Sequence, residues 1–435
     1  MFAYDTGWEV RIGVEEKRQG ADPEWRRWLQ DRYGSVENAE KDWGFTLRKG
    51  ENGRVHGPTD DQVSEDGPWN RMVAAYRRFW DDRFSRRYMK TAQVIHSLDP
   101  YHPISVRSGF NGTGTSAPFA LPQMPVDLFS GAKHLDYISP EGYNISGDWQ
   151  SFREAGFTTV YGKFVSGGKP VYWAELGYSA VTPDRLDEQR QFYEKIYRMF
   201  YETRSAGSAA WWWPGYLIWE RSDFAVINPD FTLRPAAYEY TKMAKMAATP
   251  YPVKKPDYWI EVDRDKYAIG YAGMLADKRA EYGKAVGEGK TVGLRTKGTG
   301  TDTSNFPKIA VGDTPLNGHN PPKFLNAEFN SLEINGVAVQ DGDKVQVKAG
   351  TPFLARASLG NIAEVKWLAS NVNLQVTGLE APVLAPIAKD TPFLGDAEVN
   401  SFLMPSITNQ TKVGFQLMVD GIVFGEKRFV TLEVK

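Results

Sequence analysis

The segment Lys169-Pro-Val-Tyr-Trp-Ala-Glu-Leu-Gly177 contains a short apolar run, residues 171–174, that leads directly into a glutamate, Glu175. A second run of the same kind, Phe2-Ala-Tyr-Asp-Thr-Gly-Trp-Glu9, lies at the start of the sequence. Short apolar runs predict buried strands, and a carboxylate at the end of such a strand is costly to bury unless it is paired or functional. Glu9 and Glu175 are therefore the first candidate site residues.

Amphipathic stretches separate these runs from other short apolar runs in the first 245 residues. Apolar residues recur at helical spacing from about residue 69 to 98 and from about residue 183 to 206, which predicts two helices. Alternating strands and helices indicate parallel strands joined by crossover helices, and hence an α/β fold. In a parallel α/β barrel the catalytic groups lie where the strands end, which is where both glutamates fall.

The pattern changes after residue 248, and we expect three domains, at 1–248, 249–315 and 316–435. Strand and helix patterns with glycine-containing loops predict a small α/β appendage or connection for residues 249–315. The last domain shows short alternating strands separated by turns such as Asn335-Gly336. About seven such strands predict a β-sandwich of immunoglobulin type, for which we favour a bracing role.

The composition excludes several classes of function. Lys plus Arg number 52 and Asp plus Glu number 54, a balance that gives no electrostatic reason to expect a nucleic acid or a membrane surface as partner. The chain has no Cys, and its five His never show H-x-x-x-H spacing, so we expect no metal and no cofactor. No apolar run reaches the ~18 residues that a membrane span needs. The 14 Trp, 21 Tyr and 23 Phe are suited to stacking on sugar rings, although aromatic rings also fill cores.

Two carboxyl groups at the ends of different strands are the arrangement that glycoside hydrolysis requires. One carboxyl protonates the leaving oxygen and the other attacks the anomeric carbon; a separation of roughly 5–5.5 Å gives retention of configuration. A single glutamate at a strand end is more often a partner in an ion pair. Two of them, flanked by aromatic residues on separate strands, favour the catalytic interpretation.

Several segments resemble the clan A glycoside hydrolases, in particular the family 42 β-galactosidases. The run that ends in Glu9 resembles the fourth-strand motif with its acid/base glutamate, and the run that ends in Glu175 resembles the seventh-strand nucleophile motif. Residues 25–43 resemble the helix that follows strand 4, and residues 224–236 are similar to the segment after strand 8. Together these matches cover about residues 1–240.

The resemblance implies a (β/α)8 TIM barrel in which Glu9 is the acid/base and Glu175 the nucleophile, with a carbohydrate as substrate. It also implies that the chain begins at strand 4, so that it contains the C-terminal part of the barrel, strands 4–8. We therefore expect a fragment, or a barrel that a partner chain completes. No signal-peptide pattern is visible in the first residues of this sequence, as expected if its start is missing. The localisation and the oligomeric state therefore stay open.

Two positions depart from the family pattern. Trp8 stands where the clan usually has an Asn that contacts the sugar 2-hydroxyl, and Glu141 on the sixth strand stands where relatives often have His. The resemblance implies that Tyr143 hydrogen-bonds the nucleophile. A third carboxyl near Glu175 is expected to raise the pKa of one of the group by like-charge repulsion.

Three further residues are candidates for substrate binding. Trp213, the last of three consecutive Trp after the eighth strand, is our choice for the floor beneath the sugar. Arg107 at the end of the fifth strand is a candidate donor near the site, and Trp149 in the loop after strand 6 is a candidate subsite platform. For each of them, packing or a structural ion pair is an alternative role.

Three functional hypotheses follow. The first is a retaining hydrolase that cleaves a β-glycosidic bond in an oligo- or polysaccharide by double displacement. The second, which the departures at Trp8 and Glu141 permit, is a non-catalytic carbohydrate-binding or scaffold protein. The third is a chain that is inert because strands 1–3 are absent.

Overall fold

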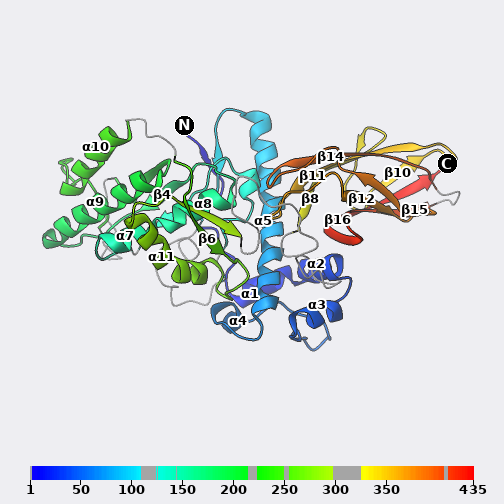
Figure 1. Cartoon of the computed structure of the whole chain (residues 1–435), viewed down its shortest axis with the longest axis horizontal. Helices are drawn as coiled ribbons and strands as arrows, with labels where there is room; N and C mark the ends of the chain where they lie inside the picture. The colour runs from blue at the N-terminus through cyan, green and yellow to red at the C-terminus, as the bar shows by residue number, and fades with distance from the viewer. Residues whose placement is uncertain are drawn as a thin grey trace. The chain divides into compact units, whose positions relative to one another are not determined.

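The computed structural model describes residues 2–108, 124, 126–143, 145–213, 223–248, 254–296, 325–405 and 410–435. The chain forms two compact units (Figure 1). The first unit contains residues 1–20 and 48–297, and the second contains residues 21–47 and 298–435. Within the described residues, no helix is both long and apolar enough to cross a membrane.

Five strand segments of the first unit pair in parallel and in chain order. They are β1 (Tyr4–Asp5), β2 (Ile104–Ser105), β3 (Glu141–Gly142), β4 (Tyr172–Leu176) and β5 (Gly207–Ala210). β1 pairs with β2, and β4 pairs with both β3 and β5. A parallel bridge between Arg107 and Ser139 joins the two groups. Parallel pairing with helical crossovers confirms the predicted α/β class.

Helices lie between these strands along the chain. The helices of this part of the first unit are α1 (Glu15–Arg18), α4 (Asp60–Ser64), α5 (Asn70–Leu98), α7 (Trp149–Ala155), α8 (Phe157–Val165), α9 (Leu186–Thr203) and α10 (Pro235–Ala247). The apolar residues of α5 that recur at helical spacing, among them Met72, Phe79 and Phe84, are buried. The helices predicted near residues 69–98 and 183–206 therefore correspond to α5 and α9.

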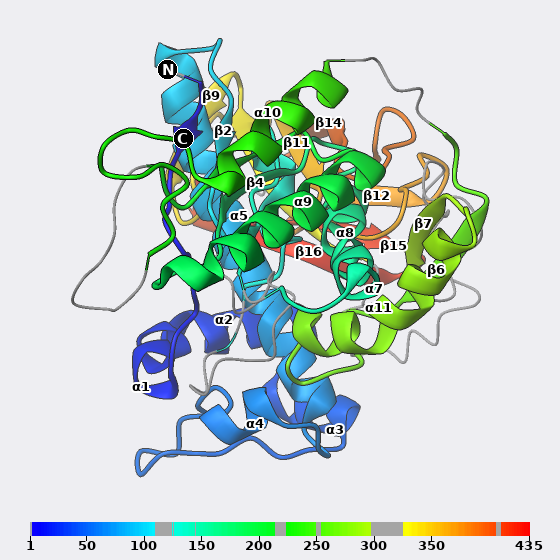
Figure 2. The ribbon, with the colours of Figure 1, turned by 90° about the vertical axis from the view of Figure 1, so that its left-hand side faces the viewer.

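A further strand–helix–strand segment belongs to the first unit. It consists of β6 (Tyr258–Val262), α11 (Tyr271–Gly287) and β7 (Val292–Thr296), and its two strands pair in parallel. α11 packs against α7 and α8 (Figure 2). The predicted appendage at 249–315 overlaps this segment, but its residues 297–315 lie outside the described residues.

Buried ion pairs tie this segment to α5. Arg264 donates to Asp81 at 2.6 Å and to Asp127 at 3.0 Å, and all three side chains are buried. Arg77 of α5 donates to the backbone carbonyls of Arg264, Tyr267 and Ala268. Because a guanidinium and its carboxylates are buried together here, removing one of them leaves an unpaired buried charge.

Most of the second unit is made of two sheets that share one core (Figure 1). Its strands are β8 (Ala327–Ile334), β9 (Val337–Ala338), β10 (Lys344–Val347), β11 (Phe353–Asn361), β12 (Val372–Thr377), β13 (Val383–Pro386), β14 (Asp396–Leu403), β15 (Gln410–Val419) and β16 (Ile422–Val434). One sheet has the order β14-β11-β8-β9 and the other β10-β16-β15-β12-β13. The strand pairs are antiparallel except β10 with β16. Apolar residues alternate along the strands, and Trp367 is buried in the shared core.

Two helices from the start of the chain also belong to the second unit. α2 (Asp22–Tyr33) and α3 (Val36–Trp43) are joined by the ring of Trp25, which stacks on Trp43 at 6.1 Å. Within α2, Trp25 also stacks on Trp28 at 5.3 Å. Arg32 of α2 donates to Asn326 at 2.7 Å. The segment is helical as the resemblance implied, but it groups with the C-terminal sheets, and α2 is in contact with β16.

Candidate active site

Glu175 is the last residue but one of β4, a strand whose start is firmly anchored. Lys169, just before β4, donates to the carbonyl oxygens of Ala132, Lys133 and Leu135 and so anchors the start of the strand. The pairing of β4 with β5 shifts register between Trp173 and Leu176, an irregularity of the kind that re-aims side chains next to sites. Gly177 follows because a Cβ there would collide with the carbonyl oxygen of Trp211.

Glu9 lies just beyond β1 in an unusual backbone conformation. Its φ is 44°, in the left-handed region that non-glycine residues rarely occupy. The next residue, Val10, returns to parallel pairing, and its N–H donates to the carbonyl of Arg107 at 3.1 Å. Strain of this kind persists where the surrounding structure holds it, and it clusters at functional sites.

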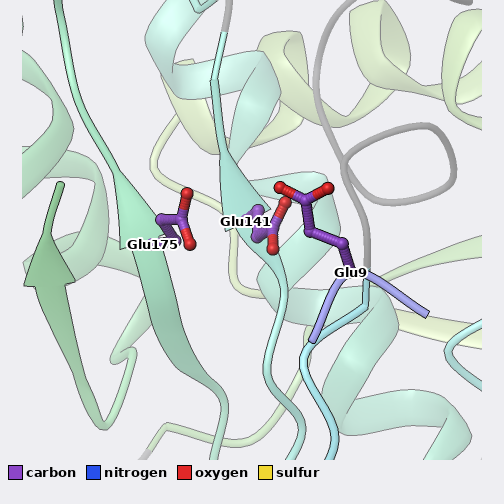
Figure 3. A group of neighbouring side chains, drawn as sticks. All are labelled: Glu9, Glu141 and Glu175. Carbon is purple, nitrogen blue, oxygen red and sulfur yellow. The ribbon is translucent and has the colours of Figure 1, made fainter. Parts of the chain in front are cut away.

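Three carboxyl groups converge at these strand ends. Carboxylate oxygens of Glu9, Glu141 and Glu175 lie within 4.8 Å of one another, and Figure 3 shows Glu141 between the other two. Glu141 and Glu175 are register partners in the parallel pair β3–β4, which accounts for their closeness. Glu9 and Glu175, which the sequence predicts as site residues, thus lie in one cluster with Glu141.

Basic and hydroxyl side chains surround the cluster. Arg107 donates through Nη1 to Glu175 and through Nε to Asp5, the latter at 3.1 Å. The Tyr143 hydroxyl donates to Glu175 Oε1 at 2.5 Å. Arg11 donates to Glu9 Oε2 at 2.6 Å, so each of these two glutamates has its own guanidinium.

Burial dominates the protonation of two of the three carboxyls. Burial raises the pKa of Glu175, while the hydrogen bond from Tyr143 and the charge of Arg107 oppose the rise. Burial, followed by the charges of Glu175 and Glu9, raises the pKa of Glu141 to about 9. Burial and the bond to Glu175 also raise the pKa of the Tyr143 hydroxyl, which therefore remains a donor.

An aromatic edge borders the cluster. Trp8 is 63% exposed, and the Arg107 guanidinium lies 5.2 Å from the centroid of its ring. The ring of Trp211, which directly follows β5, lies 6.4 Å from that of Trp8. A flat, exposed aromatic face next to charged groups is suited to stacking on a sugar ring.

Trp213 and Trp149 are the two other aromatic residues that the sequence predicts for the site. Trp213 is 58% exposed, and it is Trp211 rather than Trp213 whose ring is adjacent to Trp8. Trp149 is the first residue of α7 rather than a loop residue, and the Arg198 guanidinium lies 4.0 Å from its ring. A guanidinium thus lies over one face of this ring, and the role of Trp149 as a subsite platform stays a prediction.

The sequence analysis did not single out two residues that lie beside the three-carboxyl cluster, Arg11 and Trp211. Arg11 was not singled out, although it lies two positions after Glu9 and a cation so close to a strand-end carboxylate is a usable signal. Trp211 was considered together with its two neighbours, but only the tertiary structure shows which of the three rings approaches Trp8.

The three-carboxyl cluster also meets the distance criterion for a cation site. Its two flanking guanidinium groups, from Arg11 and Arg107, already bind Glu9 and Glu175. Positive charge from the protein thus already lies beside two of the three carboxyl groups. The donor set therefore fits an acid–base site better than a metal site.

Residues 8–201 match the model of glycoside hydrolase family 42, described as beta-galactosidase. Comparison with curated protein sequences gives no match. Among solved structures, a polyextremophilic β-galactosidase from the Antarctic haloarchaeon Halorubrum lacusprofundi is similar, with 12% identity over 96% of this chain and 64% of that one, and a TM-score of 0.50. This chain therefore spans less than two thirds of the length of that enzyme.

Two further structures have lower TM-scores. A family 5, subfamily 18 glycoside hydrolase from Streptomyces cattleya shares 11% identity over 54% of this chain and 69% of that one, with a TM-score of 0.39. An exo-β-1,4-mannosidase from Opitutaceae bacterium strain TAV5 shares 11% identity over 83% of this chain and 64% of that one, with a TM-score of 0.38. The family model thus matches less than half of the chain, and the haloarchaeal structure shows a similar fold.

Proposed function

We propose that the chain carries the catalytic pair of a retaining glycosidase, with Glu175 as nucleophile and Glu9 as acid/base. The match to the family 42 model and the resemblance of the two glutamate motifs to clan A glycoside hydrolases support this proposal. The observation that carries the proposal is the approach of their carboxylate oxygens to within 4.8 Å. Carboxyl groups about 5 Å apart act by double displacement, because they leave no room for a water molecule between them and the sugar. The substrate is then a β-linked oligo- or polysaccharide.

The strand order supports a partial barrel. β1 to β5 pair in parallel in the order of the chain, as successive strands of a (β/α)8 barrel do. We assign them to strands 4–8 of such a barrel. We further propose that the two sheets of the second unit form an immunoglobulin-like sandwich with a bracing role.

Glu175 has the surroundings that a nucleophile needs. In the first step a Glu175 oxygen would attack the anomeric carbon while the bond to the leaving oxygen breaks and Glu9 transfers its proton to that oxygen. Arg107 and Tyr143 both donate to Glu175, so they stabilise its anion and fix its orientation. In the second step Glu9 would take a proton from water, which displaces the Glu175 oxygen from the sugar.

Glu9 is more accessible than its partner. Its side chain is about one third exposed, whereas that of Glu175 is buried. Exchange of a leaving group and of water requires this access on the acid/base side. Trp8 and Trp211 would support the sugar from the same edge, in place of the Asn contact that is usual in the clan.

A second function is favoured by one specific contact. Arg11 holds Glu9 in an ion pair at 2.6 Å, which occupies the group that must deliver the proton. If this pair persists when a sugar is bound, the site would bind carbohydrate without cleaving it. A non-catalytic carbohydrate-binding role is therefore the alternative.

Kinetics of the full chain on aryl β-glycosides, with Glu175→Gln and Glu9→Gln as variants, test the proposal. We expect turnover by the parent and its loss in both variants, with retained configuration by NMR of the first product. Glu51→Gln, an exposed change of the same chemistry, is the control. Sugar binding by calorimetry without turnover would establish the alternative, and neither binding nor turnover would identify an inert chain.

A further inference from the structure

Glu141 is a buried acidic side chain that the proposed mechanism does not use. Its exposed fraction is 0%, and neither of its carboxyl oxygens has a hydrogen-bond partner among the described residues. It lies between Glu9 and Glu175 in Figure 3. A buried ionised carboxylate without hydrogen bonds is strongly disfavoured, so the protonation of this group requires an explanation.

The charges around Glu141 are unbalanced. Glu175 on β4 and Glu9 beyond β1 face it with oxygens within 4.8 Å. The cations are Arg107, whose Nε lies 4.0 Å from Glu141 Oε1, and Arg11, which pairs with Glu9. Arg107 already serves Glu175 and Asp5. The hydroxyl of Tyr143 is donated to Glu175, which leaves Glu141 with no donor of its own.

We propose that Glu141 is a positioning residue that stays protonated beside Glu175, so that Glu175 can be the anion. The protonation state itself does not depend on the proposed function; its catalytic consequence does.

Glu141 and Glu175 compete for the guanidinium of Arg107. Glu141 and Glu175 are register partners on adjacent strands, so two negative charges would face each other at close range in a buried place. The proton goes to the carboxyl with no hydrogen-bond donor, because Glu175 is stabilised as an anion by Arg107 and Tyr143. The rise of the pKa of Glu141 to about 9 agrees with this assignment.

The protonation state of Glu141 affects the ion pair between Arg107 and the nucleophile Glu175. While Glu141 is neutral, Arg107 remains bound to Glu175. When Glu141 ionises, its oxygen 4.0 Å from Arg107 Nε competes for the same guanidinium, and Glu175 gains a second anion beside it. The site therefore loses its arrangement as the pH rises through the pKa of Glu141.

Carbon-13 NMR of the full chain with glutamate labelled at its carboxyl carbon tests the protonation directly, without any need for activity. We expect one glutamate signal to keep the chemical shift of a neutral acid at neutral pH and to titrate near pH 9. That signal should be missing in Glu141→Gln and unchanged in Glu51→Gln. Its presence in Glu141→Gln, or the absence of any such signal from the folded parent, would overturn the proposal.

A second variant keeps the test decisive if Glu141→Gln does not fold. In Glu175→Gln the neighbouring charge is removed, so the midpoint of the Glu141 signal should fall by about one pH unit or more. An unchanged midpoint would show that the charge of Glu175 does not affect the protonation of Glu141, which would contradict the proposal.

The pH dependence of kcat tests the effect of the Glu141 proton on catalysis. Because an amide imitates a neutral carboxyl, kcat of Glu141→Gln at neutral pH should stay within about tenfold of the parent, and the fall in kcat near pH 9 should disappear. A hundredfold loss at neutral pH together with an unchanged alkaline fall would show that Glu141 works as an anion and would refute its positioning role. If the parent shows no turnover, the proposed function fails while the NMR result still stands.

Discussion

The Arg107 guanidinium donates to the Glu175 carboxylate near the end of β4 and lies over the ring of Trp8. It also donates to Asp5, so one side chain links β1, the segment after β2 and β4. The nucleophile, an aromatic edge and the first strand of the sheet are thereby held in one arrangement. The loss of this side chain is expected to affect all three.

Arg107→Lys should lower kcat by about a hundredfold to a thousandfold, the effect that removing one oriented donor from a site commonly has. Lysine is a point charge without the planar fork, so it cannot serve Glu175 and Asp5 in the same geometry. Steady-state kinetics on an aryl glycoside measure the change. Arg190→Lys, on the exposed side of α9, is the matched control, and equal activity of the two variants would contradict the assignment.

Tyr143→Phe should shift the acidic limb of the pH–rate profile toward higher pH. The Tyr143 hydroxyl bond lowers the pKa of Glu175, so its removal raises that pKa, and Glu175 then needs a higher pH to ionise. A hydrogen bond to a charged group is worth about 1.5–3 kcal/mol, so kcat should also fall by about tenfold to a hundredfold. The exposed Tyr101→Phe serves as control; a limb that moves to lower pH would show that the bond favours the neutral acid.

Trp8→Ala should weaken sugar binding with little effect on the fold, because the ring is exposed. An aromatic stacking contact contributes about 0.5–1.5 kcal/mol beyond its buried area, so the Kd should rise by about threefold to tenfold or more. Calorimetric titration of Glu175→Gln with and without the Trp8 change measures this effect. Trp213→Ala provides the comparison, and a larger loss there would restore Trp213 as the platform.

Arg264→Met should destabilise the first unit by about 3–5 kcal/mol, since it leaves Asp81 and Asp127 buried without their cation. Denaturant unfolding followed by tryptophan fluorescence measures the loss. Arg295→Met removes a more exposed ion pair with Glu261 and should cost about 1 kcal/mol or less. Similar losses in the two variants would mean that the buried cluster contributes no more than a surface pair.

Glu141→Gln should become more stable relative to the parent as the pH rises. The pKa of Glu141 is about 9 in the folded chain against 4.5 as the ordinary value, so folding retains a proton that the unfolded chain releases between these pH values. The resulting penalty is absent below about pH 4.5 and grows up to about pH 9, and the amide removes it. Thermal unfolding of both proteins across this range measures the difference; a constant difference would mean that Glu141 does not titrate abnormally.

Local sequence signals determined much of the architecture. The 3.6-residue pattern of α5 and α9 and the alternation along β15 and β16 depend on neighbours within one element, and the structure shows these elements near the expected positions. The strand-end positions of Glu9 and Glu175 were readable for the same reason. Parallel strands that pair in order bring their ends together, so two such glutamates already suggested a cluster.

Most of the other groups of that cluster are brought to it by contacts between segments that lie far apart in the sequence. The register of β3 against β4 sets Glu141 beside Glu175, and Arg11 donates to Glu9, whose backbone is left-handed. The choice of Trp211 over Trp213, and the grouping of α2 and α3 with the C-terminal sheets, depend on contacts between distant segments. Periodicity reports which face of an element is buried, but the partner that buries it is set by packing across the whole unit.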